Sequence, residues 1–127
     1  MITYNFEPLK ARKIIEPGIY SASIKKVESR VTSKGDPQRM VVFELENGDT
    51  IADFILETKQ VEWKIQQLFY ACEMKCEGKV KVSDEWSEVL GKELQVKIET
   101  QEYNGKENSR IVAYYLPKQN PEEPENA

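Results

Sequence analysis

The sequence predicts one mainly-β domain with five strands and a helix, and three observations indicate it. Apolar and polar side chains alternate along several stretches, with the period of two that marks a half-buried strand. Two Asn-Gly pairs, Asn47-Gly48 and Asn104-Gly105, offer the positive backbone angles of tight hairpin turns. Between them, apolar residues recur at the spacing of an amphipathic helix. A chain of 127 residues is long enough to bury one core.

The first three strands are expected in one run. The first begins at Gly18, the second covers 40–46 and the third covers 50–56, with a basic loop at 29–39 after the first strand. In the second strand we expect the odd-numbered apolar residues to point inward: Val41, Phe43 and Leu45. In the third strand we expect three apolar residues on one face and Asp53 on the other: Ala52, Phe54 and Leu56.

A helix and a second hairpin follow. The helix is expected to start after Thr58 as N-cap and to stop at Gly78. Its apolar residues are spaced 4, 3, 1, 3 and 4 apart: Val61, Ile65, Leu68, Phe69, Cys72 and Cys76. A short second helix is expected from Ser83 to Gly91. The fourth strand covers 93–103, with Leu94, Val96 and Ile98 inward, and the fifth covers 109–116.

Three strands, a helix and two strands are the element order of a five-stranded OB-fold Greek-key barrel, with the helix between strands three and four. We therefore divide the chain into an N-terminal extension at 1–17, an OB-fold domain at 18–117 and an acidic tail at 118–127. The tail has no residue that could anchor a core, so we expect it to be disordered. In such barrels the loop after the first strand lies beside the mouth that holds oligonucleotides or oligosaccharides.

Composition argues against several classes of function. The chain has no histidine, which removes the commonest general base, so we expect a binding protein and not an enzyme. We expect no cofactor and no metal, since Cys72 and Cys76 would need carboxylates to complete a zinc site and core thiols explain them better. A hydrolase would need carboxylates such as Glu44, Asp53 and Glu99 to converge, which nothing in the sequence predicts.

The sequence also bears on location. No apolar run approaches the ~20 residues that cross a bilayer. The first residues lack the pattern of a signal peptide, so a cytoplasmic protein is expected.

The first candidate site is the basic loop and its flanks. The net charge of the chain is −4, but 25–39 holds five cations against two acidic residues, which is +3. Local positive charge can follow a phosphate backbone even when the whole chain is acidic. The candidate nucleic-acid-binding residues here are Lys25, Lys26, Arg30, Lys34 and Arg39. The alternative is a solvated hairpin loop whose lysines keep a strand edge soluble.

The second candidate site is the last hairpin, which combines cations with tyrosines. Single-strand binders stack bases on aromatic rings and follow the backbone with cations. The candidates are Lys97, Tyr103, Lys106, Arg110 and Tyr114. The alternative for Tyr114 and Tyr115 is that one fills the core while the other covers an edge.

Strands two and three argue against binding on their own surface. The segment 40–57 carries five acidic residues and no cation: Glu44, Glu46, Asp49, Asp53 and Glu57. If these carboxylates face outward, a polyanion must avoid the two strands and run from the basic loop to the last hairpin instead.

The third candidate is the tail, with Glu122 and Glu123 between two prolines and Glu125 after the second. It could compete with nucleic acid for basic residues or recruit replication and recombination proteins. The alternative is a solubilising terminus without a partner.

Four runs of residues carry a family resemblance: PGIYSASIKKVE, SKGDPQRMVVFEL, VEWKIQQLFYACE and GKELQVKIETQEYNGKENSRIVAYYLP. Over roughly 17–117 the chain resembles small phage or prophage single-stranded-DNA-binding proteins of the OB fold. The resemblance implies sequence-nonspecific binding of single-stranded DNA in phage DNA replication or recombination, with the acidic tail contacting partner proteins. It falls on loop and hairpin residues: Lys34, Gly35, Pro37, Tyr103, Asn104, Gly105 and Lys106.

The alternative to DNA binding is a protein-interaction module on the same fold that binds a replication or recombination protein. Strand edges in such barrels can pair between subunits, so a homodimer is compatible with this fold.

Overall fold

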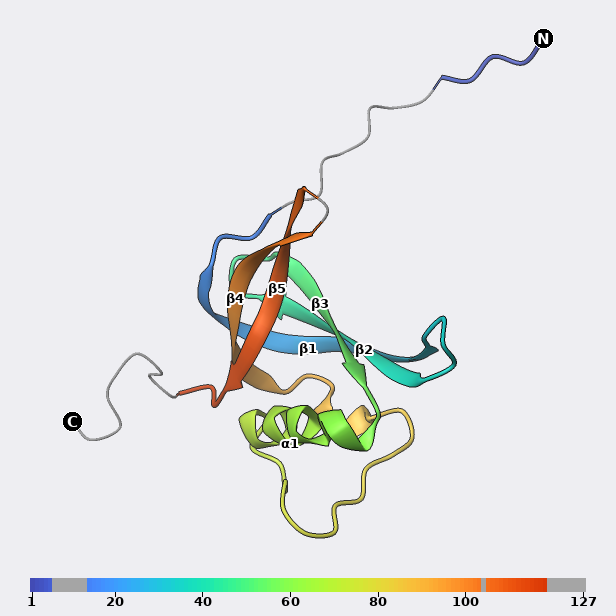
Figure 1. Cartoon of the computed structure of the whole chain (residues 1–127). Helices are drawn as coiled ribbons and strands as arrows, with labels where there is room; N and C mark the ends of the chain where they lie inside the picture. The colour runs from blue at the N-terminus through green and yellow to red at the C-terminus, as the bar shows by residue number, and fades with distance from the viewer. Residues whose placement is uncertain (6–13, 104, 119–127) are drawn as a thin grey trace.

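Five strands form one antiparallel sheet in the order β3-β2-β1-β4-β5. The computed structural model describes residues 1–5, 14–103 and 105–118, without the side chain of Tyr103 (Figure 1). The elements are β1 (Gly18–Val31), β2 (Pro37–Leu45), β3 (Thr50–Leu56), α1 (Glu62–Ala71), β4 (Glu93–Tyr103) and β5 (Lys106–Tyr115). The predicted mainly-β class and the five strands are therefore confirmed.

The strand bounds differ from the prediction around the basic loop. The bounds of β3 and β4 are as predicted, but β1 and β2 pair as far as Val31 and Pro37. Only a tight turn remains between them, closed by hydrogen bonds from Thr32 N to Asp36 O and from Gly35 N to Thr32 O, both 2.9 Å. The loop is shorter than predicted because the ladder continues through its polar residues. In the second hairpin, β5 begins at Lys106, three residues before the predicted start at 109.

The predicted helices are wrong in their bounds. α1 begins at Glu62, and Thr58 makes no capping side-chain hydrogen bond to the short 3₁₀ turn Lys59–Val61 that precedes α1. It ends at Ala71, soon before Glu73 takes a left-handed backbone conformation with φ 60°, which a continuous helix cannot include.

The predicted second helix from Ser83 is reduced to a 3₁₀ turn at Ser87–Val89. Ser83 Oγ accepts the backbone N–H of Ser87 at 3.0 Å, and Ser83 N donates to the Glu88 carboxylate at 2.9 Å. These local bonds compete with helical ones, which is the usual effect of serine at such a position.

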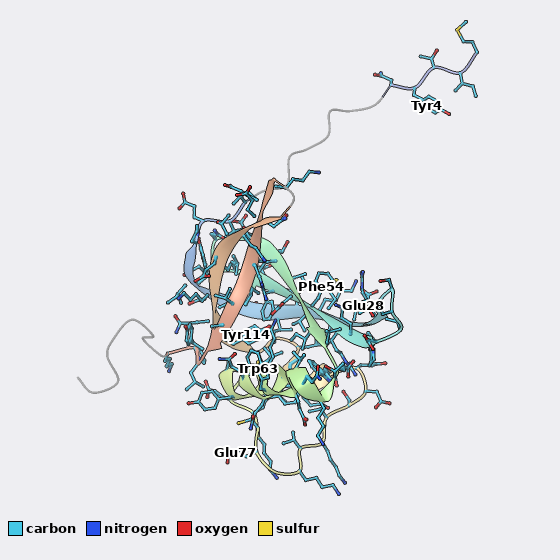
Figure 2. The ribbon with its side chains drawn as sticks, viewed as in Figure 1. Tyr4, Glu28, Phe54, Trp63, Glu77 and Tyr114 are labelled. Carbon is cyan, nitrogen blue, oxygen red and sulfur yellow. The ribbon has the colours of Figure 1, made fainter. Side chains whose placement is uncertain are left out.

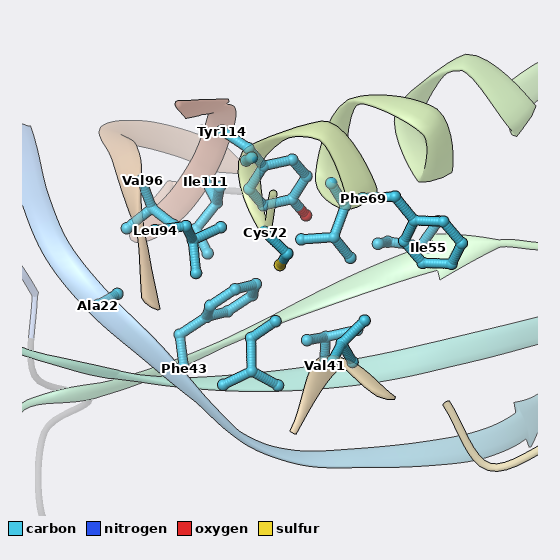
Figure 3. Close-up of a cluster of buried hydrophobic side chains, with 14 of the residues drawn as sticks. Ala22, Val41, Phe43, Ile55, Phe69, Cys72, Leu94, Val96, Ile111 and Tyr114 are labelled. Atoms are coloured by element: carbon cyan, nitrogen blue, oxygen red, sulfur yellow. The ribbon is translucent and has the colours of Figure 1, made fainter. Parts of the chain in front are cut away.

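The core lies between the inner face of the sheet and α1, which runs across one end of the sheet (Figure 1, Figure 3). All six inward residues predicted for β2 and β4 are buried: Val41, Phe43, Leu45, Leu94, Val96 and Ile98. The helix and its C-terminal end contribute Leu68, Phe69, Ala71 and Cys72. Phe43 stacks on Tyr114 with ring centroids 5.8 Å apart.

The N-terminal extension contributes one core residue. Ile15 is buried, and its backbone N–H donates to Ser109 Oγ at 2.7 Å, while that hydroxyl donates back to Ile15 O at 3.2 Å. Ile15 of the extension therefore packs against β5. In the described part of the chain, no helix has the length and apolar character to cross a membrane.

β3 presents to the core the opposite set of residues from the one predicted. Asp53 and Ile55 are buried, whereas Phe54 is 47% exposed. Asp53 tolerates burial because Tyr114 donates a hydrogen bond to its Oδ2 and Lys64 Nζ lies 3.1 Å from its carboxylate oxygens. The outward residues of β3 are therefore Ala52, Phe54 and Leu56.

Candidate nucleic-acid interface

The reversed face of β3 creates an apolar surface on the outside of the sheet. Phe54 lies opposite Met40 of β2, Ala52 lies opposite Val42, and Leu56 lies opposite Gln38. We call the outward side chains of these two strands the β2–β3 outer face. Figure 2 shows Phe54 on β3, between the β4–β5 hairpin and the β1–β2 turn.

The acidic residues of this segment do not cover the β2–β3 outer face. Asp53 points into the core, and Glu57, beyond the end of β3, pairs with Arg39 at 2.9 Å. Glu46 and Asp49 belong to the turn at the far end of the hairpin. Only Glu44 is on the face itself, 3.7 Å from Lys25 Nζ. The condition for a polyanion to avoid both strands, carboxylates that face outward on them, is therefore met by Glu44 alone.

Cations of β1 border this face on the side of β2. Lys26 lies opposite Val42, and Arg30 lies opposite Gln38, after a shift of register at Lys25. Lys26 Nζ and Arg30 Nη2 both form ion pairs with Glu28 Oε2, at 3.5 Å and 3.6 Å. Exposed ion pairs of this kind contribute ~0–1 kcal/mol, so a phosphate can replace Glu28 at small cost. Lys34 is exposed in the turn beyond Arg30.

Arg39 is not available to a ligand. Arg39 is 9% exposed. Its Nε donates a hydrogen bond to Glu57 Oε1 at 2.9 Å, and its Nη1 donates one to Asp84 O. The guanidinium also lies over the Trp86 ring, 4.7 Å from the centroid. Arg39 is an odd-numbered residue of β2 and points toward the core side of the sheet, as Val41 does. It therefore joins β2 to the segment before β4 and cannot contact a phosphate.

Tyr114 is also a structural residue. It is 2% exposed, and its hydroxyl donates to Asp53, so no base can stack on its ring. Burial, and then the Asp53 charge, raise the pKa of this phenol well above its usual range. The alternative interpretation, in which one tyrosine of the pair Tyr114 and Tyr115 fills the core, fits the structure: Tyr114 is buried in the core and Tyr115 is half-buried.

A groove of about 590 Å³ separates β3 from β5 and brings Phe54 and Arg110 to the same cavity. Arg110 is exposed, and its Nη1 donates to Gln101 Oε1 at 3.3 Å. The paired charges of Lys64 and Asp53 lie in the wall of the same groove. Among the described residues, no group of three or more cysteine, aspartate or glutamate side chains could hold a metal ion.

The profile of a family described as "Protein of unknown function (DUF669)" matches residues 2–124. The chain belongs to this family. A search of curated proteins finds no match to it. The chemistry of this DUF669 chain must therefore be argued from its own residues.

The other hairpin candidates of this DUF669 chain are placed unevenly. Lys106 is exposed at the start of β5. Lys97 lies opposite Ile19, and Ile19 and Lys26 are seven positions apart on β1, which is roughly 20 Å along a strand. The structure therefore does not bring Lys97 together with the β1 cations. The side chain of Tyr103, Asn104 and the tail glutamates Glu122, Glu123 and Glu125 lie outside the described residues.

Sequence reasoning missed Phe54, and the hairpin turn explains why. An Asn-Gly turn with two loop residues would pair Val41 with Phe54 and point both inward. In this DUF669 chain Leu45 N donates to Asp49 O, so three residues form the loop and Val41 pairs with Asp53. A shift of one residue exchanges the two faces of a strand. The signal that could have found Phe54 is the alternation of Ile51, Asp53 and Ile55, which fits the core equally well.

Proposed function

We propose that this protein binds single-stranded DNA without sequence preference, in phage DNA replication or recombination, and that it works by binding and not by catalysis. The observation that carries the proposal is Phe54, an aromatic ring exposed at the centre of an apolar strand face. Proteins that bind single strands stack bases on such rings, at ~1–3 kcal/mol per base. We propose the cytoplasm of a bacterial host as the place where it acts.

The charges around Phe54 support the same proposal and suggest a path. Lys26, Arg30 and Lys34 follow one border of the β2–β3 outer face, and Arg110 lies beyond its other border. A strand that crosses from the β1–β2 turn over Phe54 to the β4–β5 hairpin would meet cations at both ends and an aromatic ring between them. The acidic tail would compete for these cations.

We also propose that the sheet is a barrel of the OB type. β1 pairs with β4 through its first half and with β2 through its second half, with a shift of register at Lys25, as expected for a strongly coiled first strand. The contact of Asp53 with Tyr114 spans the side where β3 and β5 would meet in a closed barrel. In chain order α1 lies between β3 and β4, as the helix of an OB fold does.

The test is a fluorescence-anisotropy titration of a labelled oligo-dT at low and moderate salt. It uses the full chain and a variant that ends at Lys118. We expect affinity to fall steeply with salt, because each neutralised phosphate adds about 0.7 to the logarithmic salt slope on single strands. We expect tighter binding without the tail. No binding to single-stranded DNA or RNA at low salt, with or without the tail, would reject the proposal.

A second candidate, a module that binds a replication or recombination protein, is favoured by the outer side of α1. Trp63 and Tyr70 are 62% and 51% exposed there, seven residues apart and therefore on one helix face. If the titration finds no nucleic acid, this surface becomes the leading candidate. Loss of a partner's binding in Trp63→Ala would then support it.

A further inference from the structure

Three grooves on this molecule differ in the charges that line them. The groove between β1, β2 and β4 is lined by Glu44, Glu46 and Glu93 without a cation. The groove between α1 and the segment after it has Lys59 and Glu62, which balance. The β3–β5 groove has Lys64, Arg110 and Asp53, a net charge of +1. Of these three, only the β3–β5 groove favours an anionic ligand.

Within the β3–β5 groove the unbalanced charge belongs to Arg110. Lys64 is matched by Asp53 at 3.1 Å. The cross-strand neighbour of Arg110 is Glu99, whose carboxylate lies 3.7 Å from Lys97 Nζ. Among the described residues no carboxylate lies within ion-pair distance of Arg110. A phosphate at the hairpin side of the groove would therefore meet an accessible guanidinium, which suits phosphate recognition.

The opposite wall of the groove is the free edge of β3. Hydrogen bonds from Leu45 N to Asp49 O and from Glu57 N to Pro37 O flank the β2–β3 ladder, so odd-numbered residues of β3 bond to β2. Residues of an antiparallel strand alternate in this respect. The backbone N–H and C=O groups of Ala52 and Phe54 therefore point away from β2, toward the groove. β3 is an edge strand among the described strands, so the sheet leaves these groups unused.

We propose that the β3–β5 groove is a subsite for one nucleotide of the bound strand. An unstacked base enters beside the free edge of β3, stacks on Phe54 and hydrogen-bonds to the backbone of Ala52 and Phe54, while its phosphate pairs with Arg110. The volume of about 590 Å³ lies within the ~300–1,000 Å³ of small-molecule sites. This inference rests on the proposed function, and it adds that the strand leaves the β2–β3 outer face by inserting a base and does not only pass over it.

The experiment follows backbone amides of the full ¹⁵N-labelled chain by NMR while thymidine monophosphate is added, with thymidine and inorganic phosphate in separate titrations. We expect saturable shifts at Ala52, Phe54 and Arg110, with a dissociation constant on the order of millimolar for one nucleotide. Thymidine should shift the β3 amides, and phosphate should shift Arg110.

A matched pair of variants tests the groove itself. Thr50 and Thr100 are both exposed on strands, but only Thr50 lines the groove. Thr50→Trp should fill it and weaken nucleotide binding by about tenfold, within the range expected for loss of one stacked base. Thr100→Trp should leave it unchanged.

The outcomes separate this inference from the proposed function. If oligo-dT binds but the nucleotide causes no saturable shift at the β3 edge, the subsite is wrong and the function stands. Equal nucleotide affinity in Thr50→Trp and the wild type would also overturn the subsite. If neither ligand binds, both proposals fail. The wild-type titration decides the question even if Thr50→Trp does not fold.

Discussion

The hydroxyl of Tyr114 on β5 donates a hydrogen bond to the carboxylate of Asp53 on β3, two strands at opposite edges of the sheet. Lys64 of α1 holds the same carboxylate, with Nζ 3.1 Å from both oxygens. Three elements that share no backbone ladder are therefore joined by side chains. Because the carboxylate is buried and has two partners, its loss would leave both without one.

The first prediction concerns the stability of this contact. Asp53→Ala should lower the free energy of unfolding by about 3 kcal/mol, because it leaves Lys64 half-buried without its counter-charge. Tyr114→Phe should cost about 1–2 kcal/mol, since it removes one donor and keeps the packed ring. Urea denaturation followed by circular dichroism measures both.

Tyr115→Phe is the control, since Tyr115 is next in sequence and only half-buried. It should change stability by less than about 0.5 kcal/mol. Equal effects of the two tyrosine variants would contradict the role given to the Tyr114–Asp53 contact.

The second prediction concerns base stacking on the β2–β3 outer face. Phe54→Ala should weaken oligo-dT binding by about 1–3 kcal/mol, because a base loses its aromatic partner. Folding should be preserved, since the ring is half exposed. Anisotropy titration measures the affinity, and thermal unfolding checks the fold.

Tyr70→Ala supplies the matched control, because Tyr70 is an aromatic residue of similar exposure on α1. Its affinity for oligo-dT should equal that of the wild type. Unchanged binding in Phe54→Ala would mean that the strand crosses another surface.

The third prediction separates two arginines of the basic segment. Arg30→Ala should reduce the logarithmic salt slope of DNA binding by about 0.7, the value for one lost phosphate contact, and leave stability unchanged. Arg39→Ala should instead destabilise the fold by about 1–3 kcal/mol, because Glu57 and Asp84 O lose a buried donor.

Titrations at four or more salt concentrations give the slope, and urea denaturation gives the stability. A changed salt slope in folded Arg39→Ala would show that the buried guanidinium reaches DNA after all, and would reject its assignment as structural.

The fourth prediction concerns pH and Cys72. Burial raises the pKa of the Cys72 thiol from 9.0 to about 12, with a smaller opposing effect from Lys92. A raised pKa means that the folded state holds the proton more tightly than the unfolded state does. This contribution is therefore complete below about pH 9 and is lost as pH rises from 9 toward 12.

The free energy of unfolding, measured from pH 8 to pH 11, should fall above pH 9, and less steeply in Cys72→Val. In the wild type at pH 8, iodoacetamide should alkylate half-buried Cys76 much faster than Cys72, as mass spectrometry of peptides can measure. Equal rates at the two thiols would contradict the burial of Cys72.

Several features of this protein follow from the sequence alone. Apolar and polar alternation together with the turn residues identified the strands, and β3 and β4 have the predicted bounds. The inward residues of β2 and β4 are as predicted. In β4 only one face is apolar, so burial allows one orientation there. The exposed cations Lys26, Arg30 and Lys34 were also identified from charge alone.

The tertiary structure decided the features that depend on register and on distant partners. Both faces of β3 carry apolar residues, so local pattern could not choose between Asp53 and Phe54, and a third residue in the 46–48 loop made the choice. Arg39 and Tyr114 resemble ligand-binding residues in sequence. In the structure Arg39 contacts Glu57 and Trp86, and Tyr114 donates a hydrogen bond to Asp53. A burial pattern is a local property, whereas the face of a two-sided strand and the partner of a charge are set by residues that only folding brings near.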